Sequence, residues 1–171
     1  MAQDNMAFNP NQKLTFQQMA EDHLDEVMGI EALSFTSPWS RKAYLYELHN
    51  NDFAHYIVAR LEDRIVGYAG MWVLMDESHI TTVAVHPVCR GRGLGRSIMA
   101  EMMRRSLIMG VTRITLEVRS SNQPARSLYA SLGFVEKGLR KKYYADNNED
   151  AVVMWAELMQ EESFCNYVKM I

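Results

Sequence analysis

The residues with the clearest chemical potential form a glycine-rich loop in the middle of the chain. Residues 80–95 read ITTVAVHPVCRGRGLG, in which a β-branched strand and a turn lead into the loop. Gly91, Gly93 and Gly95 lack a Cβ atom, so the backbone there can approach a ligand closely. The helix predicted to follow presents free N–H groups and a partial positive charge at its start. The loop is therefore predicted to bind an anion.

Three arginines crowd the same helix start and bear on the charge of that anion. Arg90, Arg92 and Arg96 lie among the glycines, and the first acid in the following helix is Glu101. Cations at this end oppose the helix dipole and repel one another. A multiply charged anion such as a pyrophosphate would offset both effects. A solvated glycine-rich turn with incidental arginines is the alternative, and the loop alone leaves both interpretations open.

Two other glycine-loop motifs fit this segment less well. A Walker A loop ends in Gly-Lys-Ser or Gly-Lys-Thr, whereas Arg96 follows Gly95 here. A Rossmann fingerprint needs a third glycine at position 96 and a first glycine directly after the strand, where residues 86–90 intervene. Glu117 does lie near the expected distance for a ribose-binding acid. A nucleotide-binding module therefore remains an alternative from another functional class.

A second informative segment, LEVRSSNQPARSLYASLGF, covers residues 116–134. It is predicted to be a strand ending near Glu117, followed by a helix capped by Asn122 and ended by Gly133. A glutamate at a strand end is usually a surface acid, and a tyrosine such as Tyr129 on an apolar helix face is usually a core residue. The segment therefore needs further context before a chemical role is assigned to it.

Hydrophobic periodicity and breaker residues place both segments in an α/β sheet. Strands are predicted over residues 14–19, 54–61, 65–75, 79–85, 113–118, 134–143 and 151–158. Helices are predicted from a cap at Asp22 to Ser34, from a cap at Ser40 to Leu48, from Leu94 to a stop at Gly110, and from Asn122 to Gly133. Strands and helices alternate in the middle of the chain and strands pair near its ends, which indicates a mixed sheet.

Composition indicates one globular domain. The 171 residues are 48% hydrophobic and 23% charged, which is ordinary for a protein with a single core. We expect this domain at residues 14–158, a disordered arm at 1–13, and a tail at 159–171 whose apolar residues could support an oligomer. The arm lacks a signal-peptide core, and no apolar run reaches the length of a membrane span. Two cysteines form no disulfide framework, which suits the reducing cytoplasm.

Several other site types are disfavoured by the sequence. The five histidines show no metal-ligand spacing, so no metal site is predicted. Cys89 has no evident partner base and is predicted to be a small buried or turn residue rather than a nucleophile. A net charge of −3 argues against broad nucleic-acid binding, and no direct contact with nucleic acid is expected. The basic run of Lys137, Arg140, Lys141 and Lys142 is either an RNA-contacting strip or a solvated face.

In combination, the motifs resemble the GNAT superfamily of N-acetyltransferases over residues 14–158. Within it they are most similar to the RimI-type enzymes, which acetylate the N-terminal alanine of a ribosomal protein. In chain order the motifs are Phe35 with Pro38-Trp39-Ser40, Val83-Ala84-Val85, Glu117-Val118-Arg119 with Asn122, Leu128-Tyr129 with Leu132-Gly133-Phe134, Tyr143-Tyr144, and Glu149-Asp150. The resemblance implies a single-domain fold with a mixed, mostly antiparallel twisted sheet of about seven strands, flanked by about four helices.

The resemblance also implies a site for acetyl-CoA and a reaction. The backbone at Val83, Ala84 and Val85 resembles the segment that pairs with the pantetheine arm like an added strand. The implied pyrophosphate cradle consists of Arg90, Gly91, Arg92, Gly93, Leu94, Gly95 and Arg96, and Asn122 resembles a residue that contacts the cofactor arm. Glu117 resembles the general base, and Tyr129 the general acid that protonates the leaving thiolate. The family's amine substrate attacks the thioester directly, without a covalent acyl-enzyme.

The chemistry of amines favours an N-terminal acceptor. An α-amine has a reference pKa near 7.7–8.0 and a lysine near 10.4, so far more of an α-amine is neutral near pH 7.5. Glu117 could act as its base, directly or through water, if burial raises its pKa. Phe35, Trp39, Tyr143 and Tyr144 are predicted to wall a narrow slot for a flexible protein N-terminus. Lysine side chains, other N-termini or a small amine remain alternative acceptors.

Overall fold

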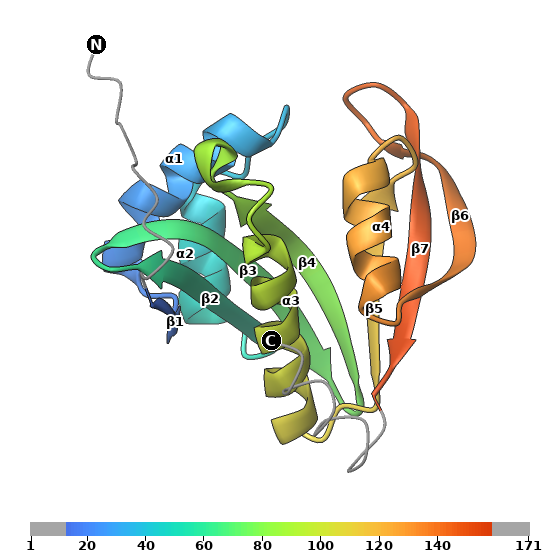
Figure 1. The fold of residues 1–171 in the computed structure, drawn as a ribbon, viewed down its shortest axis with the longest axis horizontal. Helices are drawn as coiled ribbons and strands as arrows, with labels where there is room; N and C mark the ends of the chain where they lie inside the picture. Colours follow the sequence, from blue (N-terminus) through green and yellow to red (C-terminus); the bar gives the residue numbers. More distant parts are fainter. Residues whose placement is uncertain (1–12, 159–171) are drawn as a thin grey trace.

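Seven strands form one sheet with helices on both of its faces in a computed structural model that describes residues 13–158 (Figure 1). The strands are β1 (Leu14–Gln18), β2 (Ala54–Leu61), β3 (Arg64–Leu74), β4 (Glu77–Val85), β5 (Arg113–Arg119), β6 (Val135–Tyr144) and β7 (Glu149–Glu157). The helices are α1 (Leu24–Ser34), α2 (Arg41–Asn50), α3 (Leu94–Ile108) and α4 (Gln123–Ser131), with short 3-10 turns η1 (Glu21–His23) and η2 (Pro87–Cys89).

The order of the strands across the sheet is β1-β2-β3-β4-β5-β7-β6. All neighbouring pairs are antiparallel except β4 and β5, which are parallel and are connected through α3. A parallel pair needs such a crossover because a tight hairpin can join only antiparallel strands. The predicted mixed, mostly antiparallel sheet of about seven strands with about four helices is confirmed.

Each face of the sheet carries its own hydrophobic core. One core includes the buried face of α3, with Ile98 and Met102 fully covered, and Tyr129 of α4 packs against it. The other lies under α1 and α2 and contains three buried tyrosines, Tyr44, Tyr56 and Tyr68. The Tyr44 ring meets the other two edge-on at centroid distances of 5.9 and 6.0 Å. The sheet is therefore packed against helices on both of its faces.

Local signals located most of the element ends. Ser40 caps α2 and Asn122 caps α4, each accepting a backbone N–H at 3.2 Å, as predicted. The predicted cap at Asp22 is wrong, because Asp22 lies inside η1 and the N-cap of α1 is His23. His23 makes no side-chain cap to α1; its imidazole instead accepts the N–H of Ala20 at 3.1 Å, at the start of η1.

The parallel pair is short, and its end is the feature that shapes the site. β4 and β5 pair from Glu77–Arg113 only to Ile80–Leu116, although both strands continue further. At the next residue, Thr81, β4 has one residue more than its other neighbour β3, which is a β-bulge. A bulge bends the strand that contains it. Figure 1 shows β4 and β5 meeting at one end and diverging towards the other.

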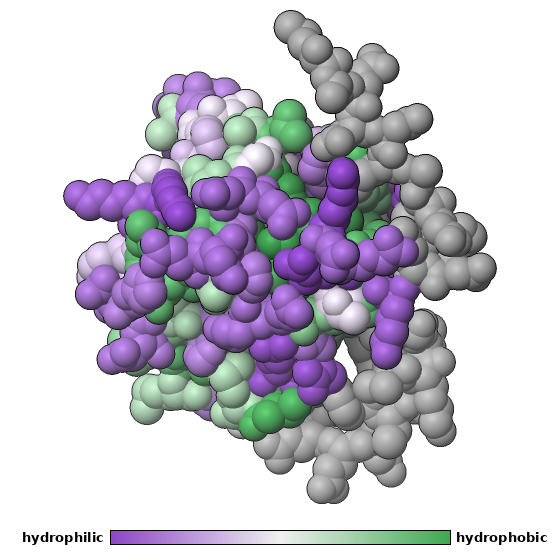
Figure 2. Space-filling model, turned by 90° about the vertical axis from the view of Figure 1, so that its left-hand side faces the viewer, coloured by the Kyte–Doolittle hydropathy of each residue, from purple (hydrophilic) through white to green (hydrophobic). Residues whose placement is uncertain are grey.

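Figure 2 shows the side of the molecule that lies on the left in Figure 1, near β1 and α1. Its surface is largely hydrophilic, with hydrophobic residues visible between the polar ones. No helix within residues 13–158 is long and apolar enough to cross a membrane. The arm predicted at 1–13 lies outside the described residues except for Lys13, and the whole tail predicted at 159–171 lies outside them. The predicted domain boundaries and the proposed oligomer contact of the tail therefore stay predictions.

Candidate active site

Two of the loop glycines have a backbone conformation that favours glycine. Gly91 and Gly93 have φ values of 75° and 77°, in the left-handed region where residues with a Cβ are strained. Gly93 is the N-cap of α3, and it supplies no side chain to bond the first N–H groups of the helix. The first turn of α3 contains no acidic residue. These N–H groups and the helix dipole therefore present a positive end where an anion would be favoured.

Gly95 has a different structural role from the other two glycines. Its φ is not in the left-handed region, but a Cβ at this position would lie 3.3 Å from Leu128 of α4. That distance is tighter than most real Cβ contacts, so the glycine allows the start of α3 to approach α4 closely. This helix contact was not predicted from the sequence, and the predicted approach of a ligand to Gly95 stays a prediction.

Two of the loop arginines are anchored to the protein. Arg90 donates through Nε to the carbonyl of Val85 at 3.0 Å and through a terminal nitrogen to Ser34 Oγ at 3.0 Å. Arg96 donates to Ser131 Oγ at the end of α4 at 2.8 Å. The guanidinium groups therefore brace the loop against α1, β4 and α4 while their positive charge stays beside the start of α3.

The strand segment before the loop presents a backbone edge to the widening space. Val83 and Val85 direct their side chains to the core under α3, and Ala84 is buried in the opposite core. Beyond Ile80, no strand among the described residues pairs with β4 on its β5 side. An edge of this kind can accept another extended chain as an added strand. Because Arg90 already bonds the Val85 carbonyl, that added pairing would use the other backbone groups of this edge.

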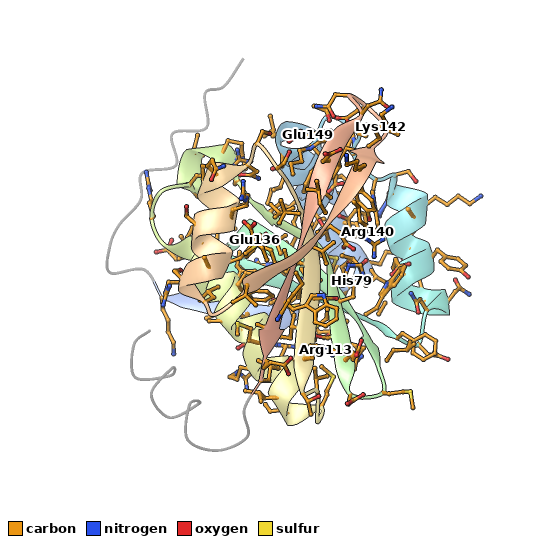
Figure 3. The ribbon with its side chains drawn as sticks, turned by 90° about the vertical axis from the view of Figure 1, so that its right-hand side faces the viewer. His79, Arg113, Glu136, Arg140, Lys142 and Glu149 are labelled. Atoms are coloured by element: carbon orange, nitrogen blue, oxygen red, sulfur yellow. The ribbon has the colours of Figure 1, made fainter. Side chains whose placement is uncertain are left out.

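Glu117 lies on β5 at the first position after the pairing with β4 ends. Its side chain is only 8% exposed, and each carboxylate oxygen has a partner. Oε2 is 2.5 Å from Nε2 of His79 on β4, and Oε1 is 3.1 Å from a terminal nitrogen of Arg140 on β6. Figure 3 labels His79 and Arg140 among the side chains around these strands. The structure therefore brings together three side chains from three strands.

The electrostatics of Glu117 correct one expectation from the sequence. Burial alone would raise the pKa of this carboxyl group, as predicted. The hydrogen bond from His79 has the largest influence, and together with the electrostatic effect of the nearby His79 and Arg140 side chains it outweighs burial and lowers the pKa of Glu117 below its ordinary value. Glu117 is therefore held as a carboxylate. A carboxylate whose charged form is this well stabilised is a weaker base than the one we expected.

Two further buried carboxylates lie on the face under α1 and α2. Glu31 accepts the N–H of Trp39 at 2.8 Å and the hydroxyls of Tyr44, at 2.9 Å, and Tyr68. Burial is the largest influence on Glu31 and raises the pKa of its carboxyl group. Glu47 accepts the indole N–H of Trp72 at 2.6 Å. The Trp72 ring in turn meets His79 edge-on at 6.5 Å, which connects α2 to the Glu117 group.

Tyr129 stands on α4, where its ring packs beside Phe134 at a centroid distance of 5.8 Å. The side chain is half-buried, and no hydrogen bond of its hydroxyl is found within residues 13–158. Burial, followed by the nearby phenol of Tyr144, raises the pKa of Tyr129 to about 12. The phenol is therefore protonated at neutral pH and retains a proton that it can donate.

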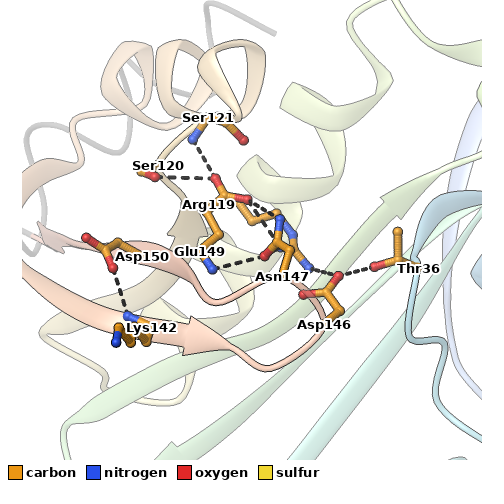
Figure 4. A network of polar contacts seen from close by, with 9 residues as sticks. All are labelled: Thr36, Arg119, Ser120, Ser121, Lys142, Asp146, Asn147, Glu149 and Asp150. Carbon is orange, nitrogen blue, oxygen red and sulfur yellow. Dashed lines mark hydrogen bonds and ion pairs between the residues drawn. The ribbon is translucent and has the colours of Figure 1, made fainter.

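The two segments predicted to wall the peptide slot lie next to each other. The hydroxyl of Thr36, in the segment between α1 and α2, donates to Asp146 in the turn between β6 and β7 (Figure 4). Phe35 and Tyr143 are exposed at 38% and 44%, so their rings are available to a ligand. Trp39 instead packs on Tyr44 at 5.6 Å.

Arg119 holds the turn between β6 and β7 in place. Its guanidinium group bonds Asp146 at 2.8 Å, Asn147 at 3.1 Å and Glu149 at 3.2 Å (Figure 4). The same group stacks over the ring of Tyr144 at 3.9 Å. Tyr144 is thereby covered on one side by the guanidinium group. The sequence singled out the motif containing Arg119 but did not predict this network.

The contacts of Asn122, Cys89 and Arg140 bear on the roles that the sequence suggested for them. Asn122 uses its side-chain oxygen to cap α4, which leaves its NH₂ group as the part able to contact a cofactor. Cys89 is buried, and burial raises the pKa of its thiol, which disfavours a nucleophilic thiolate. Arg140 of the basic run pairs with Glu117. In the part of the chain that is described, no group of three or more His, Cys, Asp or Glu residues could hold a metal ion.

His79 is the site residue that sequence reasoning missed. His79 is 38 positions from Glu117 in the sequence. The spacing of the histidines was informative only about metal ligands, and it does not connect His79 with a distant glutamate. A usable signal did exist, because His79 and Glu117 were both predicted on strands that flank one crossover helix. Such strands are commonly neighbours in a parallel pair.

The opposite pKa directions of Glu117 and Glu31 predict the order in which these groups titrate. In a carbon-13 NMR titration, the carboxyl carbon of Glu117 should change below the ordinary range of glutamate, and that of Glu31 above it. Because the pKa of Glu117 is lowered in the folded state, its stabilising contribution should be lost as the pH falls through that value. Arg140→Gln should raise the pKa of Glu117 and leave Glu31 unchanged. Titration of Glu117 above Glu31 would contradict this assignment.

Comparison with known proteins agrees with this arrangement. Residues 24–134 match the model of the acetyltransferase (GNAT) family. A Salmonella typhimurium [ribosomal protein bS18]-alanine N-acetyltransferase is 36% identical over 129 residues, which cover 73% of this chain and 84% of that protein. A Bacillus subtilis protein, provisionally named for the same activity, is 40% identical over 146 residues, covering 85% of this chain and 97% of its own.

The fold comparison gives the same result. The crystal structure of the ribosomal-protein-S18-alanine N-acetyltransferase from Escherichia coli superposes with a TM-score of 0.80 at 28% identity, covering 88% of this chain and 97% of that chain. The resemblance predicted from residues 80–95 and 116–134 is therefore confirmed, and the chain belongs to the GNAT family of acetyltransferases.

Proposed function

We propose that this enzyme transfers an acetyl group from acetyl-CoA to the N-terminal α-amine of a protein, namely the N-terminal alanine of a small-subunit ribosomal protein. The family uses acetyl-CoA as its acetyl donor, and similar proteins from Salmonella and Escherichia coli are named for acetylation of a ribosomal-protein alanine. The observation that carries the proposal is the divergence of β4 and β5 at Glu117, beside an unpaired β4 edge and the positive start of α3. We assign the activity to residues 14–158.

Acetyl-CoA would lie along three features of the widening space. Its pantetheine arm would extend along the β4 edge at residues 83–85, where the backbone lacks a strand partner on the β5 side. Its pyrophosphate would bind the amides of residues 91–96, next to the charges of Arg90 and Arg96. The NH₂ group of Asn122 would contact the arm from the start of α4. This placement directs the thioester towards the end of the β4–β5 pairing.

The reaction there is a direct transfer. The lone pair of the neutral α-amine attacks the thioester carbonyl, a C–N bond forms and the C–S bond breaks. The amine proton passes to the pair formed by Glu117 and His79, directly or through water, and the leaving thiolate takes the proton of Tyr129. A tyrosine that stays protonated until its proton is needed suits that second step.

A flexible N-terminus is the acceptor that the surroundings favour. The contact between Thr36 and Asp146 closes the α1–α2 segment against the β6–β7 turn. Phe35 and Tyr143 expose aromatic rings on these two segments, and such rings can wall a narrow entrance for an extended chain. Such an entrance would admit an extended chain more readily than a folded protein surface. A ribosomal-protein acceptor would place the reaction in the cytoplasm.

The acceptor assignment predicts which nitrogen is acetylated. Peptides that begin with alanine or serine should gain one acetyl group on the α-amine, because that amine is more often neutral than lysine. A matched peptide with a blocked N-terminus and the same internal lysines should not react. Tandem mass spectrometry locates the added group. Acetylation mainly of lysine side chains would reject the N-terminal assignment and leave the acetyltransferase assignment intact.

The proposed acid predicts a selective loss of turnover. Tyr129→Phe should lower kcat on the order of 100-fold, because a positioned acid contributes about 100- to 10,000-fold, while acetyl-CoA affinity stays unchanged. Tyr46→Phe is a matched control, since Tyr46 is 61% exposed on α2. Steady-state kinetics and calorimetry separate the two effects. A near-wild-type kcat for Tyr129→Phe would return Tyr129 to a packing role.

A further inference from the structure

The position of His79 makes it part of the reaction centre rather than of the surrounding core. His79 pairs with Thr115 in the β4–β5 register, and Glu117 lies two residues further along β5 on the same face. Diagonal neighbours of this kind are within reach of long side chains. The two side chains therefore meet where the strands begin to diverge, which is where the proposed placement of acetyl-CoA brings the thioester.

The partners of Glu117 fix the protonation of the His79 ring. A carboxylate can only accept hydrogen bonds, so the proton in the contact of 2.5 Å belongs to Nε2 of His79. In the neutral imidazole, the other nitrogen, Nδ1, then carries the free lone pair. No other hydrogen bond to this ring is found among residues 13–158. The ring is thus held in the tautomer that can accept a proton at Nδ1.

Exposure distinguishes the two side chains as candidates for contact with an amine. The His79 side chain is 37% exposed, whereas that of Glu117 is 8% exposed and has both oxygens occupied by His79 and Arg140. An amine that approached Glu117 would have to displace one of these partners. The same amine could reach the imidazole without breaking either contact.

The charges around His79 bear on its protonated form. The Glu117 carboxylate from β5 lies against the ring and would stabilise an imidazolium, whereas Arg140 from β6 opposes it from the other side of Glu117. Trp72 of β3 meets the ring edge-on and links it to the buried carboxylate of Glu47 on α2. The carboxylate in direct contact with the ring is therefore that of Glu117, and Glu47 is connected to it only through Trp72.

We propose that His79 accepts the proton of the attacking amine at Nδ1, and that Glu117 is a positioning residue that orients the ring and stabilises its charged form. This inference rests on the proposed acetyl transfer and refines its proton path. As the C–N bond forms and the C–S bond breaks, the amine proton moves to His79 and the thiolate receives the proton of Tyr129. After the products leave, His79 returns its proton to solvent and Tyr129 regains one from solvent, which restores both groups.

His79→Gln tests the proposal with little change in shape. The glutamine amide can still donate to Glu117 but cannot take up a proton. We expect kcat on an alanine-initiated peptide to fall on the order of 100-fold or more, with acetyl-CoA affinity within about twofold of wild type. His49→Gln is the matched control, because His49 is 57% exposed at the end of α2 and should retain the wild-type rate. Thermal unfolding checks that each variant is folded.

Chemical rescue separates proton transfer from positioning. His79→Ala leaves space beside Glu117, so added imidazole should raise its kcat at least tenfold, while Glu117→Gln should not respond. A His79→Gln rate within about threefold of wild type would overturn the proposal, and so would a folded His79→Ala enzyme that imidazole does not rescue. Failure of the wild-type enzyme to acetylate any α-amine would instead reject the proposed function.

Discussion

The termination of hydrogen bonding between β4 and β5 is the constraint on which the site depends. Ile80 and Leu116 are the last partners, and the bulge at Thr81 bends β4 away from β5. Backbone groups beyond this point cannot be satisfied by the neighbouring strand. Buried backbone polar groups that lack partners are costly, so such an edge is suited to a ligand with its own amide groups. The pantetheine arm of acetyl-CoA contains such groups.

The same divergence of β4 and β5 accounts for the charged group formed by Glu117, His79 and Arg140 at the centre of the sheet. Glu117 is the first residue of β5 without a strand partner on β4, although it still pairs with Val153 of β7. Its side chain is almost fully buried, which would be costly for an isolated carboxylate. His79 on the neighbouring strand β4 and Arg140 on β6, the strand beyond β7, offset this cost. The group that we expected to be a base is consequently a stabilised anion, and the basic nitrogen lies one contact further out on His79. Removing either partner would leave a buried charge poorly compensated.

The elements determined by local sequence were predictable, and the site depended on contacts between distant segments. Ser40 and Asn122 were correctly identified as caps because their signals lie within four residues. The positive φ values of Gly91 and Gly93 were not predicted, because the glycines were interpreted only as positions where a ligand comes close to the backbone. The lowered pKa of Glu117 was not predictable, because it depends on His79 and Arg140, which are distant from Glu117 in the sequence.

The contacts of Gly95 and Arg140 were also not predicted, because they too depend on segments distant in the sequence. The role of Gly95 depends on how closely α3 approaches Leu128, which no local pattern encodes. Arg140 belonged to a basic run that resembled a solvated face, yet the register between β6 and β7 places it against Glu117. In both cases the residue type was noted correctly, and its partner was set by the tertiary arrangement of the sheet.

The central claim is that acetyl-CoA binds at the positive start of α3 beside the opening, and calorimetry on two matched glycine variants tests it most directly. Gly93 and Gly110 lie at opposite ends of α3, have φ values of 77° and 81°, and have no atoms within 4 Å of a built Cβ. Gly93→Val and Gly110→Val therefore introduce similar backbone strain. We predict that Gly93→Val weakens CoA binding at least tenfold and that Gly110→Val leaves it within about twofold. Equal affinities for the two variants would contradict the placement of the cofactor.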